Sequence, residues 1–193
     1  MKITPYPLWP VMDYWFYEAF RLGVTPSAEV ALTIWLARQT QGPIMEIGVH
    51  RGLVLRILAE HNPDRPCFGV DSGKPGALEQ SAEALGEEEI GQLAAHLHNV
   101  TLLKVDSTTL KLDGRFGFIR IDGDHRFEGV KADSEFAFSH ILPGGLISWH
   151  DYAESGFEWM GVKRYLDTIE GVELVAGTST AIFWQPLDKS PAL

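Results

Sequence analysis

The sequence predicts an α/β fold in which a mainly parallel sheet carries helices on both of its faces. Two observations lead to this fold class. From residue 43 onward, short apolar segments alternate with segments of helical spacing, which is the pattern of βαβ units. Acidic residues or a histidine stand where several apolar segments end, and parallel strands bring such residues to one edge of the sheet. Because ligands bind at that edge in open α/β sheets, we expect a ligand site there.

The first 40 residues are expected to form a helical extension of the same domain. The segment 11–22 is rich in aromatic residues and predicts one helix, which Gly23 stops. Thr25 then offers an N-cap, and Pro26 a first helical residue, for a second helix that runs to about Arg38. These helices either pack on the main core, cover the mouth of an active site or form a dimer contact.

The remaining elements follow in order between residues 43 and 185. The predicted strands are short apolar segments at 44–47, 67–70, 101–105, 116–121 and 146–149, with a closing pair at 172–175 and 180–184. The predicted helices have apolar residues at helical spacing and lie at 53–60, 78–97, 127–141 and 159–169. Gly86 and Gly91 weaken the middle of the second of these helices, and Pro143 with its two following glycines closes the third.

The length of 193 residues indicates a single domain over residues 1–193. Its 45% hydrophobic and 22% charged residues are close to the average of globular proteins, which excludes a disordered chain. The 26 acidic against 16 basic residues give a net charge of −10, which disfavours nucleic acid as a partner. The single cysteine, Cys67, excludes an internal disulfide and fits a reducing compartment. The apolar stretches are too short to span a membrane and the N-terminus does not resemble a signal peptide. We therefore expect a cytoplasmic protein with no membrane partner.

Residues 46–52, Glu-Ile-Gly-Val-His-Arg-Gly, join the first strand to the first core helix. Gly48 lets the backbone turn sharply, and Gly52 lets the helix approach the sheet or a ligand. The dinucleotide fingerprint needs a glycine where His50 stands, which argues against NAD or FAD. The motif indicates either a nucleoside site without a pyrophosphate or an ordinary βα turn.

Acids after the next strands fit a bound nucleoside. Asp71 ends the second strand, where a carboxylate accepts hydrogen bonds from both ribose hydroxyls, although a turn or capping acid is the alternative. Asp106 and Ser107 follow the third strand and are candidates to bind an adenine amine. Glu46 is a candidate to bind the amine of an amino-acid tail, or it ties down the glycine turn.

These motifs resemble those of class I S-adenosylmethionine-dependent methyltransferases. Residues 46–52 resemble the E-x-G-x-x-x-G turn of that family, and residues 67–71 resemble the strand whose terminal acid holds the ribose. The segments 121–133 and 142–152 resemble a small-molecule subgroup that modifies sugars and antibiotics. The resemblance covers residues 43–185. It implies S-adenosylmethionine as cofactor and a Rossmann-like, doubly wound sheet of about seven strands whose last strand is antiparallel.

A cluster of acids and histidines is expected where the fourth and fifth strands end. Its members are Asp122, Asp124, His125, His150 and Asp151, and such a set can hold a divalent cation. The resemblance to metal-dependent members implies Asp122 and the pair His150-Asp151 as ligands for magnesium or manganese. Their pair is more often Asp-Asp or Asp-Asn, so His150 departs from the pattern. Asp122 is also expected to contact the cofactor and to take part in catalysis.

Without a metal, His125 or His150 is the candidate general base, since imidazole titrates near neutral pH. The function that these residues indicate is methyl transfer from S-adenosylmethionine to a small-molecule acceptor, at a hydroxyl oxygen, with or without a metal. The alternatives are a metal-dependent hydrolase that uses the same cluster and a nucleoside-binding module without catalysis. A homodimer is expected from the apolar N-terminal segment.

Overall fold

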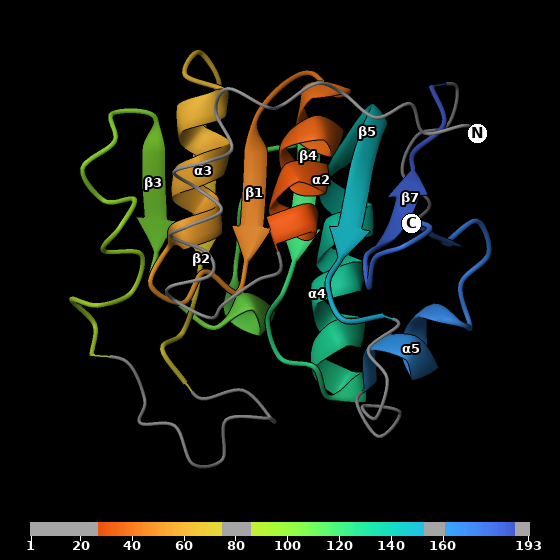
Figure 1. Ribbon diagram of the computed structural model, residues 1–193. Coiled ribbons are helices and arrows are strands. Elements are labelled where there is room, and N and C mark those ends of the chain that lie inside the picture. Colours follow the sequence, from red (N-terminus) through yellow and green to blue (C-terminus); the bar gives the residue numbers. More distant parts are fainter. Residues whose placement is uncertain (1–26, 75–85, 153–160, 188–193) are drawn as a thin grey trace.

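The centre of the protein is a seven-stranded sheet with the strand order β3-β2-β1-β4-β5-β7-β6. A computed structural model describes residues 27–74, 86–152 and 161–187 (Figure 1). The strands are β1 Ile44–Ile47, β2 Cys67–Val70, β3 Val100–Leu103, β4 Phe116–Ile121, β5 Ile141–Trp149, β6 Glu173–Leu174 and β7 Ala181–Trp184. The helices are α2 Ser27–Arg38, α3 Leu53–His61, α4 Phe127–His140 and α5 Gly161–Leu166, with a 3-10 turn η1 at Ser107–Thr109.

Strands β1 to β5 pair in parallel, so their carboxyl ends lie at one edge of the sheet (Figure 1). Strand β7 pairs antiparallel with both β5 and β6 and is therefore the strand that runs against the others. The predicted fold class, with about seven strands and an antiparallel last strand, is confirmed.

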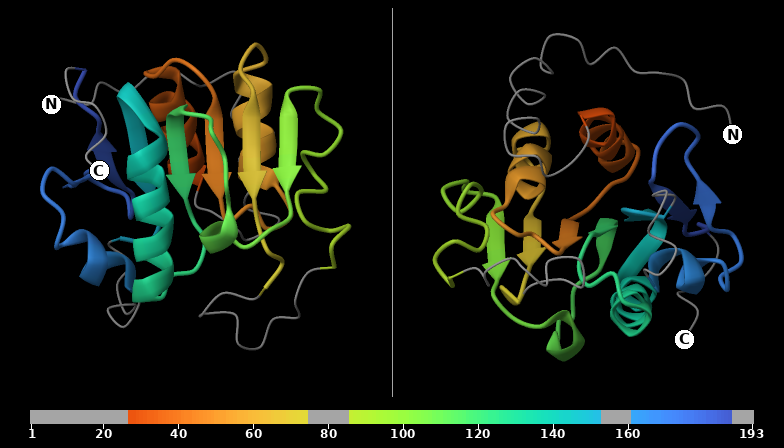
Figure 2. Two further views of the ribbon diagram at one scale, coloured as in Figure 1. Left: turned by 180° about the vertical axis from the view of Figure 1, so that it is seen from behind. Right: turned by 60° about the horizontal axis from the view of Figure 1, so that its bottom comes forward.

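Helices cover both faces of the sheet, as the two views of Figure 2 show. Helices α2 and α3 lie on one face, where Leu36 and Leu55 share a buried cluster with Phe118 of β4. Helices α4 and α5 lie on the other face, where Val130 and Val162 pack with apolar residues of β1, β4 and β5. The doubly wound arrangement follows from parallel strands that are apolar on both sides.

Strand alternation places a row of polar residues on the face that α2 covers. Glu46, Arg120 and Ser148 are paired neighbours on β1, β4 and β5, and all three are buried. They are two residues beyond Ile44, Phe118 and Leu146, which belong to the apolar cluster under α2 and α3. Because side chains alternate along a strand, the polar row faces the same side, just before the carboxyl edge.

The predicted helix 78–97 is wrong for the part that the structure describes, because residues 86–97 form turns. Gly91 has a left-handed φ of 66°, which does not fit an α-helix, and its backbone N–H donates to the carbonyl of His50. The first part of that helix, and the predicted helix 11–22, lie outside the described residues.

Several further boundaries differ from the prediction, among them the end of α5, which is Leu166 instead of residue 169. Strand β5 begins at Ile141 instead of Leu146, since Phe116 pairs with Ile141 before the register shifts toward Phe118. The Pro143 segment is therefore an irregular part of a strand. Strand β3 ends at Leu103, two residues earlier than expected. In the described ranges, no helix combines the length and the apolar character that a membrane span requires.

Candidate functional site

The glycine turn after β1 packs directly against the end of β4. Gly48 has a φ of 87°, and a Cβ atom there would lie 2.1 Å from the carbonyl oxygen of Asp122. Gly52 has a φ of 90°, and its Cβ would lie 2.8 Å from the Cα of Gly91. Both positions therefore require glycine for conformation and for space. The close approach at Gly48 brings the predicted cofactor turn beside the residues that follow β4.

Asp71 follows β2 and fastens this turn. One of its carboxylate oxygens accepts the His50 backbone N–H at 2.6 Å, and the other accepts that of Gly73 at 2.7 Å. The carboxylate thus stands at the carboxyl edge next to the glycine turn, where the ribose was expected. These hydrogen bonds show that Asp71 stabilises the turn. Its binding of the ribose stays a prediction.

Asp106, after β3, caps the short turn η1. It accepts hydrogen bonds from the backbone and hydroxyl of Thr108, and its other oxygen lies 2.9 Å from Nζ of Lys74. These hydrogen bonds lower the pKa of Asp106 to about 2. Ser107 begins η1 and hydrogen-bonds Asp133 of α4. Their contact with adenine stays a prediction.

Asp133 of α4 is a buried acid and does not lie on a solvated helix face. Its side chain is buried, and its Oδ2 lies beside the backbone of Gly123, 2.9 Å from where a Cβ would stand. Burial raises the pKa of Asp133 to about 6, although the bond from Ser107 opposes the rise. Helix α4 therefore packs on the sheet with the carboxyl group of Asp133 as well as with apolar side chains.

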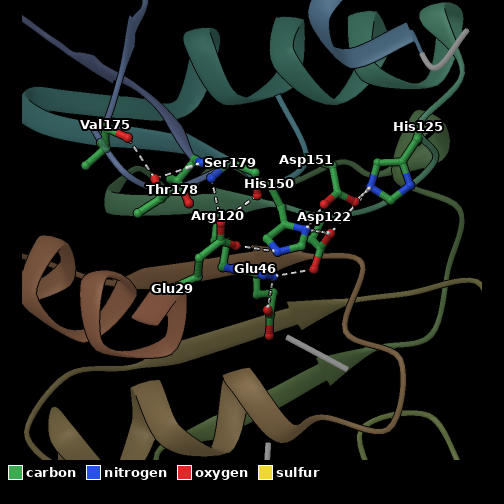
Figure 3. A network of polar contacts seen from close by, with 11 residues as sticks. Glu29, Glu46, Arg120, Asp122, His125, His150, Asp151, Val175, Thr178 and Ser179 are labelled. Carbon is green, nitrogen blue, oxygen red and sulfur yellow. Dashed lines mark hydrogen bonds and ion pairs between the residues drawn. The ribbon is translucent and has the colours of Figure 1, made fainter. Parts of the chain in front are cut away.

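Glu46 lies within β1 and is almost inaccessible to solvent. Its Oε1 is 2.7 Å from Nη1 of Arg120, and the same nitrogen is 2.8 Å from Oδ2 of Asp122 (Figure 3). Burial raises the pKa of Glu46 to about 7 against the opposing charge of Arg120. The carboxylate is thus paired inside the sheet, and its predicted role toward an amino-acid tail stays a prediction. The prediction from sequence missed Arg120, although a basic residue inside an apolar strand is a signal for such a pair.

The structure brings together four of the five predicted cluster residues. Asp122, His125, His150 and Asp151 each offer a ligand atom, and these atoms lie within 4.8 Å of one another. We call these four residues the Asp/His cluster (Figure 3). Asp124 is not part of it, because its carboxylate binds the guanidinium of Arg126 at 2.6–2.9 Å.

The contacts within the Asp/His cluster join a carboxylate to an imidazole nitrogen. His150 Nδ1 lies 2.8 Å from Oδ1 of Asp151 and 3.3 Å from Oδ1 of Asp122. His125 Nε2 lies 3.2 Å from Oδ2 of Asp151 and 3.4 Å from Oδ1 of Asp122. Each imidazole therefore stands between both carboxylates.

His150 and Asp151 both reach the cluster because the strand has already ended. Alternation along a strand would point adjacent side chains to opposite faces. Strand β5 ends at Trp149, and Asp151 has a left-handed φ of 60°. This turn directs the Asp151 carboxylate to the same side as the His150 ring.

A fifth side chain, which the prediction from sequence missed, contacts the cluster from α2. Oε2 of Glu29 lies 2.6 Å from Nε2 of His150. Oε1 of Glu29 accepts the backbone N–H and the hydroxyl of Ser179 at 2.7 and 2.5 Å. An acid within the otherwise apolar helix 27–38 is the signal that could have found it.

The charges of these groups are strongly coupled. Burial would raise the pKa of Asp122, but the charges of Arg120 and His150 hold it well below its usual range. Burial also opposes protonation of His150, yet Asp122, Asp151 and Glu29 together raise its pKa to about 12. His125 follows the same pattern, and its pKa is raised. Without a cation, the imidazole of His150 therefore supplies positive charge between the carboxylates.

The spacing of the cluster fits a bound divalent cation. Ligand atoms of a six-coordinate ion at about 2.1 Å lie roughly 3 Å apart, and the contacts here are 2.8–3.4 Å. His125 Nε2 and both ring nitrogens of His150 are buried and make no hydrogen bond of good geometry. Carboxylates suit magnesium and manganese, and imidazoles suit zinc and iron, so this mixed set of ligands can hold a divalent cation.

Comparisons with known proteins identify the family of the chain and agree with its fold. A family model described as "Methyltransferase domain" matches residues 45–152, which run from β1 past the end of β5. No curated protein matches the sequence.

Among solved structures, the O-methyltransferase NovP has 18% identity and a TM-score of 0.66, with 83% of this chain and 81% of that chain covered. A putative caffeoyl-CoA O-methyltransferase from Staphylococcus aureus has 14% identity and a TM-score of 0.67, covering 90% and 91%. MycE, a methyltransferase of mycinamycin biosynthesis solved with Mg, SAH and mycinamycin VI, has 16% identity and a TM-score of 0.58, covering 95% and 57%. At these identities the similarity shows a shared fold.

Proposed function

The chain belongs to the methyltransferase domain family, and on this premise we propose that it transfers the methyl group of S-adenosylmethionine to a hydroxyl oxygen of a small-molecule acceptor. The observation that carries the proposal is the contact between the glycine turn and the Asp/His cluster. Gly48 packs on the backbone of Asp122, so the predicted cofactor turn and a cluster suited to an acceptor hydroxyl share one edge of the sheet. A hydrolase that uses the cluster alone would not need the nucleoside site, and family membership disfavours both earlier alternatives.

The cofactor site that we propose follows the carboxyl edge from β1 to β4. The backbone of Gly48 and Gly52 shapes the turn, and Asp71 offers its carboxylate to the ribose. Asp106 and Ser107 lie after the next strand, where the adenine would be. Glu46 has an indirect role: its carboxylate binds the guanidinium of Arg120, and this contact holds Arg120 beside Asp122.

We also propose that the Asp/His cluster binds magnesium or manganese through Asp122, Asp151 and the two histidines. The bound cation would supply Lewis-acid chemistry, lowering the pKa of the acceptor hydroxyl. The fit rests on the donor spacing and on the three buried imidazole nitrogens of His125 and His150 that make no hydrogen bond of good geometry. The neighbour MycE is solved with Mg, which agrees with this proposal.

The residues of the chain contribute mainly by positioning. Methyl transfer needs an in-line approach of the acceptor oxygen, so most of the rate enhancement comes from holding the two substrates in place. Arg120 lies behind Asp122 and neutralises part of the negative charge of the cluster. Burial alone would raise the pKa of Asp122, but the charge of Arg120 holds this pKa low. Asp122 therefore stays ionised and can bind a cation.

A calorimetric titration tests both parts of the proposal. The wild-type protein should bind S-adenosylhomocysteine, the demethylated product, at micromolar affinity, and it should bind Mn²⁺ in a separate titration. Asp151→Asn should weaken Mn²⁺ binding by more than the roughly 10–100-fold that loss of an outer-shell partner causes, with the affinity for the product retained. Asp124→Asn is the matched control, because Asp124 is a nearby acid that binds Arg126 outside the cluster.

The outcomes separate the two parts. Absence of product binding by the folded protein would overturn the methyltransferase proposal. Product binding without Mn²⁺ binding would overturn the metal site, and His125 or His150 would then be the candidate base. Assays with radiolabelled cofactor and hydroxyl acceptors of the sugar and phenol classes, with and without chelator, connect binding to turnover.

Location and assembly are finer proposals that rest on sequence. We propose a cytoplasmic protein because a single, buried cysteine fits a reducing compartment. The homodimer is proposed from the aromatic segment 1–22, which lies outside the described residues. Light scattering on the full chain and on a form without residues 1–22 tests it, and equal monomer masses would overturn it.

A further inference from the structure

Helix α2 contributes a side chain to the Asp/His cluster through Glu29. We infer that Glu29 is a positioning residue that fixes the ring orientation and tautomer of His150, so that Nδ1 is the atom that ligates the cation. This inference rests on the proposed metal-dependent function. It makes the N-terminal helix a part of the site and not only a cover for the core.

The two nitrogens of His150 have different partners on opposite sides of the ring (Figure 3). Nε2 is 2.6 Å from Oε2 of Glu29, while Nδ1 is 2.8 Å from Asp151 and 3.3 Å from Asp122. The side chains of Glu29 and His150 are only 5% and 10% exposed, so water competes little for these contacts. The ring is therefore held between α2 and the cluster.

Ser179 fixes the carboxylate of Glu29 in turn. Its backbone N–H and its hydroxyl both donate to Oε1, at 2.7 and 2.5 Å. Oε1 of Glu29 therefore binds Ser179, and Oε2 contacts His150. Ser179 stands in the turn before β7, and β7 pairs with β5, the strand that His150 directly follows. Glu29, Ser179 and His150 thus form one connected unit.

The chemistry of these groups decides which nitrogen can bind a cation. The 2.6 Å contact between Glu29 Oε2 and His150 Nε2 is an ion pair whose angle is not that of a good hydrogen bond. Because an ionised carboxylate only accepts protons, Nε2 is the nitrogen that carries the proton in this contact. A histidine ligand is neutral and has one lone pair, which is then on Nδ1 and directed to Asp122 and Asp151. Carboxylates that accept from the second nitrogen of a ligand histidine orient the ring and make it more basic.

Glu29→Gln is a sharp test, because the amide is nearly the same size as the carboxylate. Its oxygen can keep both bonds from Ser179, which turns the NH₂ group toward Nε2 of His150. That contact requires a lone pair on Nε2 and moves the proton to Nδ1, where it blocks ligation. We expect the Mn²⁺ affinity to fall by about 10–100-fold and the affinity for S-adenosylhomocysteine to stay unchanged.

Glu60→Gln is the matched control. Glu60 pairs with Arg56 on α3 and has no contact with the cluster, so both affinities should match the wild type. Equal Mn²⁺ affinity of Glu29→Gln and wild type would overturn the inference and leave the metal site standing. Failure of the wild type to bind Mn²⁺ would overturn the metal site and this inference together. Failure to bind the product would overturn the methyltransferase proposal instead.

A second measurement on the wild type does not depend on the folding of a variant. The protein is labelled with ¹⁵N in histidine, loaded with NMR-active cadmium and observed by nitrogen NMR. Coupling between cadmium and Nδ1 of His150 supports the inference. Coupling at Nε2, or at neither nitrogen of His150, overturns it.

Discussion

Nη1 of Arg120 lies 2.7 Å from Oε1 of Glu46, and this ion pair joins the neighbouring strands β1 and β4 on the face of the sheet that α2 covers. Both side chains are almost fully buried, with 4% and 2% exposure. Isolated charges are costly in such a place, so the pair is stable only because each group neutralises the other. The same nitrogen contacts Asp122, which couples the core of the sheet to the Asp/His cluster.

Loss of Arg120 should therefore destabilise the protein strongly. Arg120→Met leaves two carboxylates near each other without their shared cation, and breaking a buried pair in this way costs about 3–5 kcal/mol. The free energy of unfolding in urea, measured with chelator present, checks the value. Lys131→Met is the control, because Lys131 and Glu135 form an exposed pair at 4.0 Å, and such pairs contribute about 0–1 kcal/mol. Similar losses for the two variants would contradict the prediction.

The raised pKa of Glu46 predicts an unusual pH dependence of stability. Burial raises this pKa from 4.5 to about 7 in the folded protein, against the charge of Arg120. Between these two values the folded protein holds a proton that the unfolded chain has lost. The contribution of Glu46 is therefore fully present below about pH 4.5 and is lost as the pH rises to about 7.

Glu46→Gln removes this titration, so the difference between the variant and the wild type isolates it. Relative to the variant, the wild type should lose stability between pH 5 and pH 7, by on the order of 1–3 kcal/mol. Urea denaturation of both metal-free proteins at several pH values measures the difference. A constant difference across this range would show that Glu46 stays ionised in the folded protein.

The strands were predictable because each carries its own signal. Strands β1, β2 and β4 begin and end where predicted, since each apolar run stops at a glycine turn or an acid. The parallel sheet then brings the acids and His150 to one edge, and the Asp/His cluster follows. Helical spacing failed at 86–97, because the left-handed conformation of Gly91 places it beside Gly52.

The rest of the site depends on contacts between segments far apart in the chain. Glu29 reaches His150 only because α2 packs on the face to which His150 points. Arg120 meets Glu46 through the register of β1 and β4, which local patterns do not determine. Asp151 reaches the cluster through a left-handed conformation two residues after the end of β5, where alternation along a strand would direct its side chain away from that of His150.

Asp71 should be important for cofactor affinity. Asp71→Ala removes one or two charge-assisted hydrogen bonds to the ribose, each of which contributes about 1.5–3 kcal/mol. The dissociation constant for S-adenosylhomocysteine should therefore rise by at least about tenfold. Calorimetry measures it, and a thermal melt checks that the turn held through His50 stays folded. Asp64→Asn, an exposed acid before β2 at the opposite end of that strand, is the control. An unchanged constant would mean that Asp71 only fastens the turn.

Gly48 should tolerate no side chain, for two separable reasons. The first is conformational, because a φ of 87° is unfavourable for any residue with a Cβ. The second is steric, because that Cβ would lie 2.1 Å from the carbonyl oxygen of Asp122, in backbone that cannot rotate away. Gly177 has a φ of 81° with nothing within 4 Å of its Cβ position, so it has the first cost without the second.

Comparison of the two alanine variants therefore measures the close approach itself. Gly177→Ala should cost about 1–2 kcal/mol, the usual penalty for a left-handed residue with a side chain. Gly48→Ala should cost clearly more in urea unfolding, because the end of β4 must move to admit the methyl group. That movement displaces Asp122, so Gly48→Ala should also weaken binding of Mn²⁺, which Gly177→Ala leaves intact. Equal costs for the two variants would contradict the close contact between the glycine turn and the Asp/His cluster on which the proposed function rests.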